Sequence, residues 1–166
     1  MDGLVRWMMV LAVCAALQMP AMAVDSDSGG SSGSVVQQRA DPVLEQARQA
    51  AAARDWTRAA SQLKDALAKD SQNADYHNLY AYSLRNGPNP DMGLVFKHYG
   101  EALRIDPKHR GAHEYIGEAY LQTGNLGKAK EHLSALDRLC FFPCEEYTDL
   151  KKKVAEYESK TGALAK

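Results

Sequence analysis

A repeated pairing of helices is the feature that most constrains how this chain can fold. From Asp41 to Leu139, segments of helical length alternate with short breaks rich in glycine, proline, asparagine and aspartate. Residues Ala66, Ala102 and Leu136, near the ends of every second segment, are 36 and 34 residues apart. Helix pairs repeated in this way stack, because each pair leaves an apolar face that only its neighbour can cover. The pattern therefore predicts an all-α solenoid.

The breaks divide the chain into seven expected helices, and no stretch alternates with the period of two that a strand requires. The helices are predicted over residues 42–53, 56–69, 74–86, 91–105, 109–123, 126–139 and 144–160. Asp41 followed by Pro42 is a favourable start for the first helix, with an acidic N-cap and proline at the first helical position.

The last predicted helix has the pattern of an outer, capping helix. Its apolar residues follow steps of 3, 4 and 3: Tyr147, Leu150, Val154 and Tyr157. The opposite side is charged and includes the run 151–153, three consecutive lysines. We interpret that run as a solvated face, with lipid or phosphate binding as the alternative.

The third helix pair carries the most specific motif, Tyr-Ile-Gly-Glu-Ala-Tyr-Leu-Gln-Thr-Gly-Asn-Leu-Gly-Lys-Ala, over residues 115–129. It resembles the tetratricopeptide repeat, in which a small residue (Gly117) lets two helices touch and a tyrosine (Tyr120) packs between them. A glycine (Gly124) then turns the chain, and a second small residue (Ala129) lies at the helix crossing. The motif therefore identifies the repeat type as tetratricopeptide-like.

The other two pairs match the family less closely. The second ends in the family's Glu-Ala-Leu-Arg-Ile-Asp-Pro pattern over 101–107, but its internal loop at 86–90 is two residues longer. The first has Ala47 and Ala59 at the small positions, while Arg54 stands where the family prefers glycine. The resemblance covers about 100 residues.

The resemblance implies a right-handed α-solenoid of about three units, over 41–73, 74–109 and 110–143, closed by a capping helix at 144–160 and followed by a tail at 161–166. It also implies a scaffold or adaptor that binds a protein or peptide along the concave surface formed by the first helix of each pair. The alternative is that the residues on this surface are ordinary exposed polar groups. The family's positions on it correspond to Arg48, Asn78, Tyr82, Arg85, Glu114, Tyr115, Glu118 and Gln122.

Some chaperone adaptors of this family clamp a C-terminal carboxylate with asparagines and basic residues. Here Tyr82 and Glu118 stand at positions where such residues are expected, so carboxylate clamping is not predicted.

The first 40 residues predict export and a tether. Arg6, an uncharged apolar run over 7–17, Pro20 and the sequence Ala-Met-Ala at 21–23 are typical of a signal peptide cleaved after residue 23. Residues 24–40 form a linker rich in serine, glycine and aspartate. We therefore expect a periplasmic or secreted protein without a membrane span after cleavage. The alternative is a lipoprotein anchored through Cys14, although Val13 is bulkier than a lipobox prefers.

Composition and motifs argue against several function classes. The formal net charge of -1 predicts no attraction to nucleic acid. No nucleophile-elbow, metalloprotease or phosphate-loop motif occurs, so we expect neither an enzyme nor a cofactor. His109 and His113 are four residues apart, which suits a metal site on one helical face. However, His77 and His113 occupy equivalent large, partly buried positions in two repeats, which favours packing over metal binding.

Cys140 and Cys144 lie on either side of Phe-Phe-Pro, at the junction before the last helix. We expect a structural disulfide, because an exported protein meets an oxidising environment and Pro143 bends the chain between the two residues. Two alternatives remain open. One is a redox-active pair, since Cys144 lies near a helix N-terminus that lowers a thiol pKa. The other is copper(I) capture by two thiolates. A thiol-based redox or copper-handling protein is thus the alternative function.

Overall fold

The computed structural model describes residues 41–164, with side chains described to residue 162. The predicted signal peptide, the linker, Cys14 and residues 165–166 lie outside the described residues. Seven α-helices follow one another: α1 Pro42–Ala52, α2 Trp56–Leu67, α3 Ala74–Asn86, α4 Met92–Ile105, α5 Arg110–Gln122, α6 Leu126–Leu139 and α7 Glu145–Leu164. The all-α prediction is confirmed, and no strand occurs in the described part. The seventh helix continues past the predicted end at residue 160, because no proline or turn interrupts it.

Each of the first six helices begins with a polar side chain that accepts a hydrogen bond from a backbone N–H of the first turn. The caps are Asp41, Asp55, Asn73, Asp91, His109 and Asn125. At α1, Asp41 accepts from the N–H of Val43 at 2.8 Å and of Leu44 at 3.2 Å, with Pro42 in the first turn as predicted. These local signals explain why the breaks in the sequence mark the helix boundaries so well.

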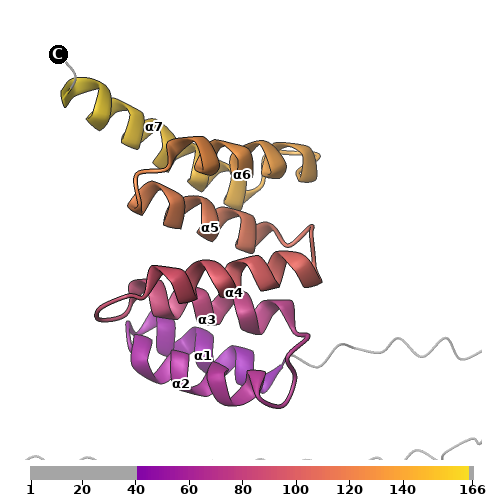
Figure 1. Cartoon of the computed structure of the whole chain (residues 1–166). Coiled ribbons are helices and arrows are strands. Elements are labelled where there is room, and N and C mark those ends of the chain that lie inside the picture. The colour runs from indigo at the N-terminus through magenta and orange to yellow at the C-terminus, as the bar shows by residue number, and fades with distance from the viewer. Residues whose placement is uncertain (1–40, 165–166) are drawn as a thin grey trace, which may run out of the picture. The chain divides into compact units, whose positions relative to one another are not determined.

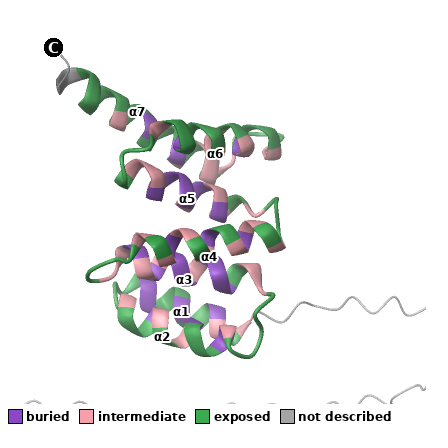
Figure 2. Ribbon diagram, viewed as in Figure 1, coloured by how far each residue is buried: buried purple, intermediate pink, exposed green. Residues whose placement is uncertain are grey.

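The helices pack in consecutive antiparallel pairs (Figure 1). Each helix contacts the next along the chain from α1 to α7. The odd-numbered helices also contact one another in series, α1 with α3, α3 with α5 and α5 with α7. They therefore share one face of the stack. Buried residues lie where helices meet, and exposed residues cover the outer sides (Figure 2).

The small residues predicted from the repeat lie at the helix crossings. Ala47, Ala59, Ala102 and Ala129 are fully buried. Gly117 is buried too, and a Cβ atom there would come within 2.6 Å of a methyl group of Leu150 on α7. A larger residue there would displace the buried Leu150 side chain, so glycine lets the capping helix dock closely on α5.

Two equivalent turns adopt a left-handed backbone. Gly124, between α5 and α6, has φ +80°, and Arg54, between α1 and α2, has φ +59°. The family's glycine preference at this turn follows from that geometry, since only glycine adopts it without steric cost. Arg54 therefore occupies a strained position. Within the described residues, no helix is both long and apolar enough to cross a bilayer.

Candidate functional site

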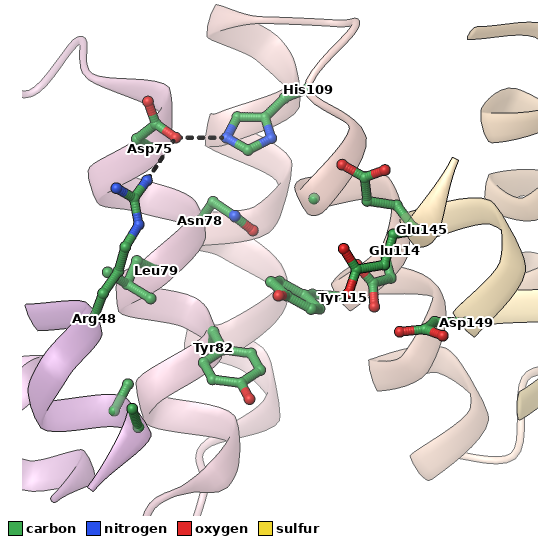
Figure 3. A pocket seen from close by; sticks show the side chains of 14 residues that line it. Arg48, Asp75, Asn78, Leu79, Tyr82, His109, Glu114, Tyr115, Glu145 and Asp149 are labelled. Atoms are coloured by element: carbon green, nitrogen blue, oxygen red, sulfur yellow. Dashed lines mark ion pairs between the residues drawn. The ribbon is translucent and has the colours of Figure 1, made fainter. Parts of the chain in front are cut away.

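A cavity of about 530 Å³ opens on the face shared by the odd-numbered helices (Figure 3). We call it the groove. Its walls come from α1, α3, α5 and the first turns of α7. Five of the eight predicted binding residues line it: Arg48, Asn78, Tyr82, Glu114 and Tyr115. The structure thus brings together residues that lie up to 67 positions apart in the sequence.

The middle of the groove is aromatic. The rings of Tyr82 on α3 and Tyr115 on α5 pack against each other at a tilt of 39°, with centroids 4.6 Å apart. The ring of Trp56 packs edge-on against the ring of Tyr82, with 5.7 Å between their centroids. Burial raises the pKa of Tyr115, so its hydroxyl stays protonated at neutral pH. This part of the groove offers flat apolar surfaces with hydroxyl groups at their ends.

One end of the groove carries the basic groups. Arg48 on α1 approaches Asp75 on α3 at 3.9 Å, and His109 Nε2 lies 3.4 Å from the same carboxylate (Figure 3). The Nδ1 atom of His109 accepts the Ala112 N–H, so in the neutral ring Nε2 carries the hydrogen and donates towards Asp75. The approach of His109 lowers the pKa of Asp75. The sequence did not suggest Asp75 and His109 as groove residues, although His109 was recognised as a helix start.

The other end of the groove is acidic. Glu114 is only 7% exposed, and among the described residues its carboxylate has neither a hydrogen-bond donor nor a basic partner within ion-pair distance. Burial raises its pKa to about 8, and the neighbouring charge of Glu118 adds to the effect. Glu145, Glu146 and Asp149 join it from α7. The sequence did not predict Glu145 and Glu146 as groove residues, because their position beside Glu114 depends on how α7 docks.

Asn78 lies between the two ends, and its amide points into the groove (Figure 3). The residue is 8% exposed, and its Oδ1 accepts no hydrogen bond from the described residues. Gly111 leaves the space beside this amide open, since a Cβ there would approach Asn78 Nδ2 to 3.3 Å. Within the described part of the chain, the groove therefore contains a buried acceptor without a donor, Asn78 Oδ1, and a carboxylate without an ion-pair partner, Glu114.

The remaining predicted residues, Arg85, Glu118 and Gln122, line a second cavity of about 410 Å³ beside α7. Arg85, predicted on the binding surface, does not line the groove and lies buried. Its side chain is 4% exposed and donates to Glu118 Oε2 at 2.6 Å. The ammonium of Lys153 on α7 pairs with the other oxygen of the same carboxylate. Arg85 and Glu118 are therefore paired with each other within the fold, and Gln122 lies exposed at the rim.

Two histidine pairs recur at equivalent positions in the second and third repeats. His77 Nδ1 lies 2.8 Å from His98 Nδ1, and His113 Nδ1 lies 2.9 Å from His132 Nδ1. Nε2 of His77 and of His113 bonds a backbone carbonyl, at 3.1 Å in each case. Because a carbonyl only accepts, Nε2 carries the hydrogen and Nδ1 is free to accept from the partner ring. No group of three or more metal-binding side chains occurs in residues 41–164.

The junction before α7 contains a disulfide between Cys140 and Cys144, whose Cα atoms are 5.8 Å apart. It joins the end of α6 to the start of α7. Phe141 and Phe142 project from this loop and are 93% and 75% exposed. The predicted pairing of the two cysteines is thus present in the structure.

The sequence matches no protein-family model and no curated protein. Its structure is similar to the type III secretion translocator chaperone SycD of Yersinia enterocolitica, with a TM-score of 0.62, 15% identity, and coverage of 72% of this chain and 83% of SycD. A SycD complex with a peptide of the translocator YopD matches with a TM-score of 0.59 and 14% identity, over 75% of this chain and 92% of that chain. An alternative dimer of SycD matches with a TM-score of 0.60, 15% identity and the same coverage. These similarities confirm the tetratricopeptide-like fold.

Proposed function

We propose that this protein is an exported scaffold that binds an extended segment of a protein or peptide in the groove. The observation that carries the proposal is Asn78 Oδ1, a buried acceptor without a donor among the described residues, in a groove that it shares with the unpaired carboxylate of Glu114 and two tyrosine rings. A buried polar group without a partner costs about 1–3 kcal/mol, and a ligand that supplies the partner removes this cost. The tyrosines provide rigid contact area of the kind that dominates binding energies.

The shape and composition of the groove suit a peptide better than a small apolar molecule. It is open along one face of the stack, and it has a basic end, an aromatic middle and an acidic end. A peptide chain presents polar groups along its backbone that can pair with such a surface. The SycD structure with a YopD peptide supports the proposal, because it shows a chaperone of similar fold in complex with a peptide.

Selection of peptides from a random display library on the purified full chain tests the proposal. We expect the selected peptides to lose about tenfold in affinity for a Tyr82→Ala variant, because an aromatic anchor is removed. Arg48→Ala serves as a second groove variant, since the exposed Arg48 side chain contributes little to folding. Lys64→Ala, on the exposed side of α2, is the matched control.

Fluorescence anisotropy measures the affinities, and circular dichroism checks that helicity is unchanged. If the selected peptides bind Tyr82→Ala and Arg48→Ala as tightly as they bind Lys64→Ala and the wild type, the groove is not the binding site.

Export of the protein is part of the same proposal, and it rests on the sequence pattern of residues 1–23. Cleavage after Ala23 makes Val24 the first residue of the mature chain. N-terminal sequencing of protein recovered from the cell envelope or medium checks this. A lipid-modified N-terminus at Cys14 would instead show an anchored lipoprotein.

A further inference from the structure

We propose that the acidic end of the groove is a subsite for a cationic side chain, a lysine or arginine of the bound segment, with Glu114 as its ion-pair partner and Asn78 Oδ1 as a second acceptor. This inference rests on the proposed peptide-binding function and specifies the chemistry that the groove selects. It assigns to the ligand a basic residue with an extended alkyl stem.

The balance of charge at this end of the groove favours a cation. Glu114, Glu145 and Asp149 have no basic partner among the described residues. Glu146 is approached by Arg110 at 3.5 Å, and Lys153 pairs with Glu118 outside the groove lining. Three carboxylates therefore border a shared space without an ion-pair partner from the described chain, and only the more distant Lys153 offsets part of the charge at Glu114. A bound cation supplies the missing positive charge.

Asn78 is an independent indication of the same ligand type. Its Oδ1 is buried, lacks a hydrogen-bond donor and belongs to a residue that lines the groove. Lysine and arginine side chains are donors that never accept hydrogen bonds. Such a side chain satisfies a carbonyl oxygen and a carboxylate together, whereas an anionic ligand has no donor for Asn78 Oδ1 and is repelled by the neighbouring carboxylates.

The aromatic middle of the groove suits the rest of a basic side chain. Alkyl stems of lysine and arginine pack on apolar surfaces while the charged group reaches a polar site. Tyr82 and Tyr115 provide such a surface beside Glu114 (Figure 3). The faces of these rings also attract a cation. The site therefore selects both the length and the charge of the bound side chain.

The protonation of Glu114 couples binding to pH. Burial and the charges of Glu118, Asp149 and Glu146 raise its pKa to about 8, while Lys153 acts in the opposite direction. At pH 6 the carboxyl group of the free protein is therefore protonated. A cation favours the ionised form, so binding releases a proton and tightens as pH rises towards 8.5. Lysine itself stays charged throughout this range.

The probe is an acetylated and amidated hexapeptide of alternating serine and lysine, compared with the same peptide carrying Nε-acetylated lysines. Calorimetry on the full chain measures both at pH 6.0 and pH 8.5. We expect the lysine peptide to bind at least tenfold more tightly than its acetylated form at pH 8.5. We also expect its affinity to rise about tenfold or more between the two pH values.

Glu114→Gln removes the charge while keeping the shape of the side chain, and we expect it to abolish both the preference for lysine and the pH dependence. Glu131→Gln, an exposed carboxylate on α6, is the matched control and should change neither. Carbon-13 NMR of the Glu114 carboxyl group gives a readout that does not depend on the peptide. Its apparent pKa should fall when propylammonium or methylguanidinium ions are added.

The outcomes separate this inference from the proposed function. If display-selected peptides bind the groove but lysine acetylation and Glu114→Gln have no effect, the cation subsite is refuted and the peptide-binding function stands. If propylammonium alone binds as tightly as the lysine peptide, the subsite accepts a free small cation and the assignment to a peptide side chain is wrong. If neither selected peptides nor the lysine peptide bind, both proposals fail.

Discussion

Arg85 on α3 and Glu118 on α5 form a buried ion pair, with 2.6 Å between the guanidinium Nη2 and the carboxylate Oε2. Lys153 on α7 reaches the same carboxylate from outside. The Glu118 side chain therefore joins three helices, namely α3 and α5 of two repeats and the capping helix α7. A buried charge is tolerated only when it is paired, so removal of one partner costs much more than removal of both.

We predict that Arg85→Ala lowers the free energy of unfolding by about 3–5 kcal/mol, because it leaves Glu118 as a buried charge with only one partner. The double variant Arg85→Met with Glu118→Leu should recover most of this loss, since it replaces the pair with apolar side chains of similar size. Denaturation by urea, followed by circular dichroism, measures both. Equal destabilisation by the single and double variants would show that packing, and not the ion pair, is responsible.

Arg54→Gly is expected to stabilise the protein by about 1 kcal/mol, because a non-glycine residue in the left-handed conformation is sterically strained. The equivalent turn supplies the converse experiment. Gly124→Ala should destabilise by about the same amount, since it places a Cβ atom at φ +80°. Thermal melting of the three proteins compares them directly. A lower melting temperature for Arg54→Gly would contradict the strain assigned to this turn.

The histidine pairs should make the fold sensitive to acid. Burial first, and then the neighbouring histidine, lower the pKa of His98 and His132 from 6.5 to about 4. Between pH 4 and pH 6.5, His98 and His132 bind more protons in the unfolded chain than in the folded one. The stability of the fold therefore falls as pH is lowered from 6.5 to 4. A variant with His98→Gln and His132→Gln should lose less stability across this window. Gln62 already occupies the corresponding position in the first repeat.

Measurement of urea midpoints at pH 4.5 and pH 7 checks the histidine prediction. Comparison of the variant with the wild type isolates the histidines from Glu114, whose raised pKa acts in the opposite sense and lowers stability as pH rises from 4.5 towards 8. Identical acid sensitivity of the two proteins would exclude the pairs as its source.

Cys140→Ser with Cys144→Ser should reduce stability by only about 1–3 kcal/mol, because the disulfide closes a short loop. Affinity for groove-binding peptides should stay unchanged, since neither cysteine lines the groove. Alkylation of untreated protein, followed by mass spectrometry, should add no mass to either residue. A loss of function in the double variant with the fold intact would favour the alternative thiol-based function.

The local sequence was sufficient to predict the helices and much of the order in which they pack. Caps such as Asp41, turn residues such as Gly124 and small residues such as Ala102 act within one or two helical turns, and their effects are readable from spacing alone. Five residues of the groove were also predictable, because the repeat places them on the first helix of each pair.

Tertiary structure decided which of the polar groups on that face are satisfied and which are open to a ligand. Arg85 and Glu114 look equivalent in the sequence, yet Arg85 finds Glu118 and Glu114 finds no partner among the described residues. The acidic end of the groove exists only because α7 docks beside α5 through Gly117 and Leu150. The histidine pairs likewise depend on two helices crossing at a particular distance. Such pairings join residues far apart in the chain and depend on the distance between packed helices, whereas sequence periodicity specifies only the face of a helix on which each residue lies.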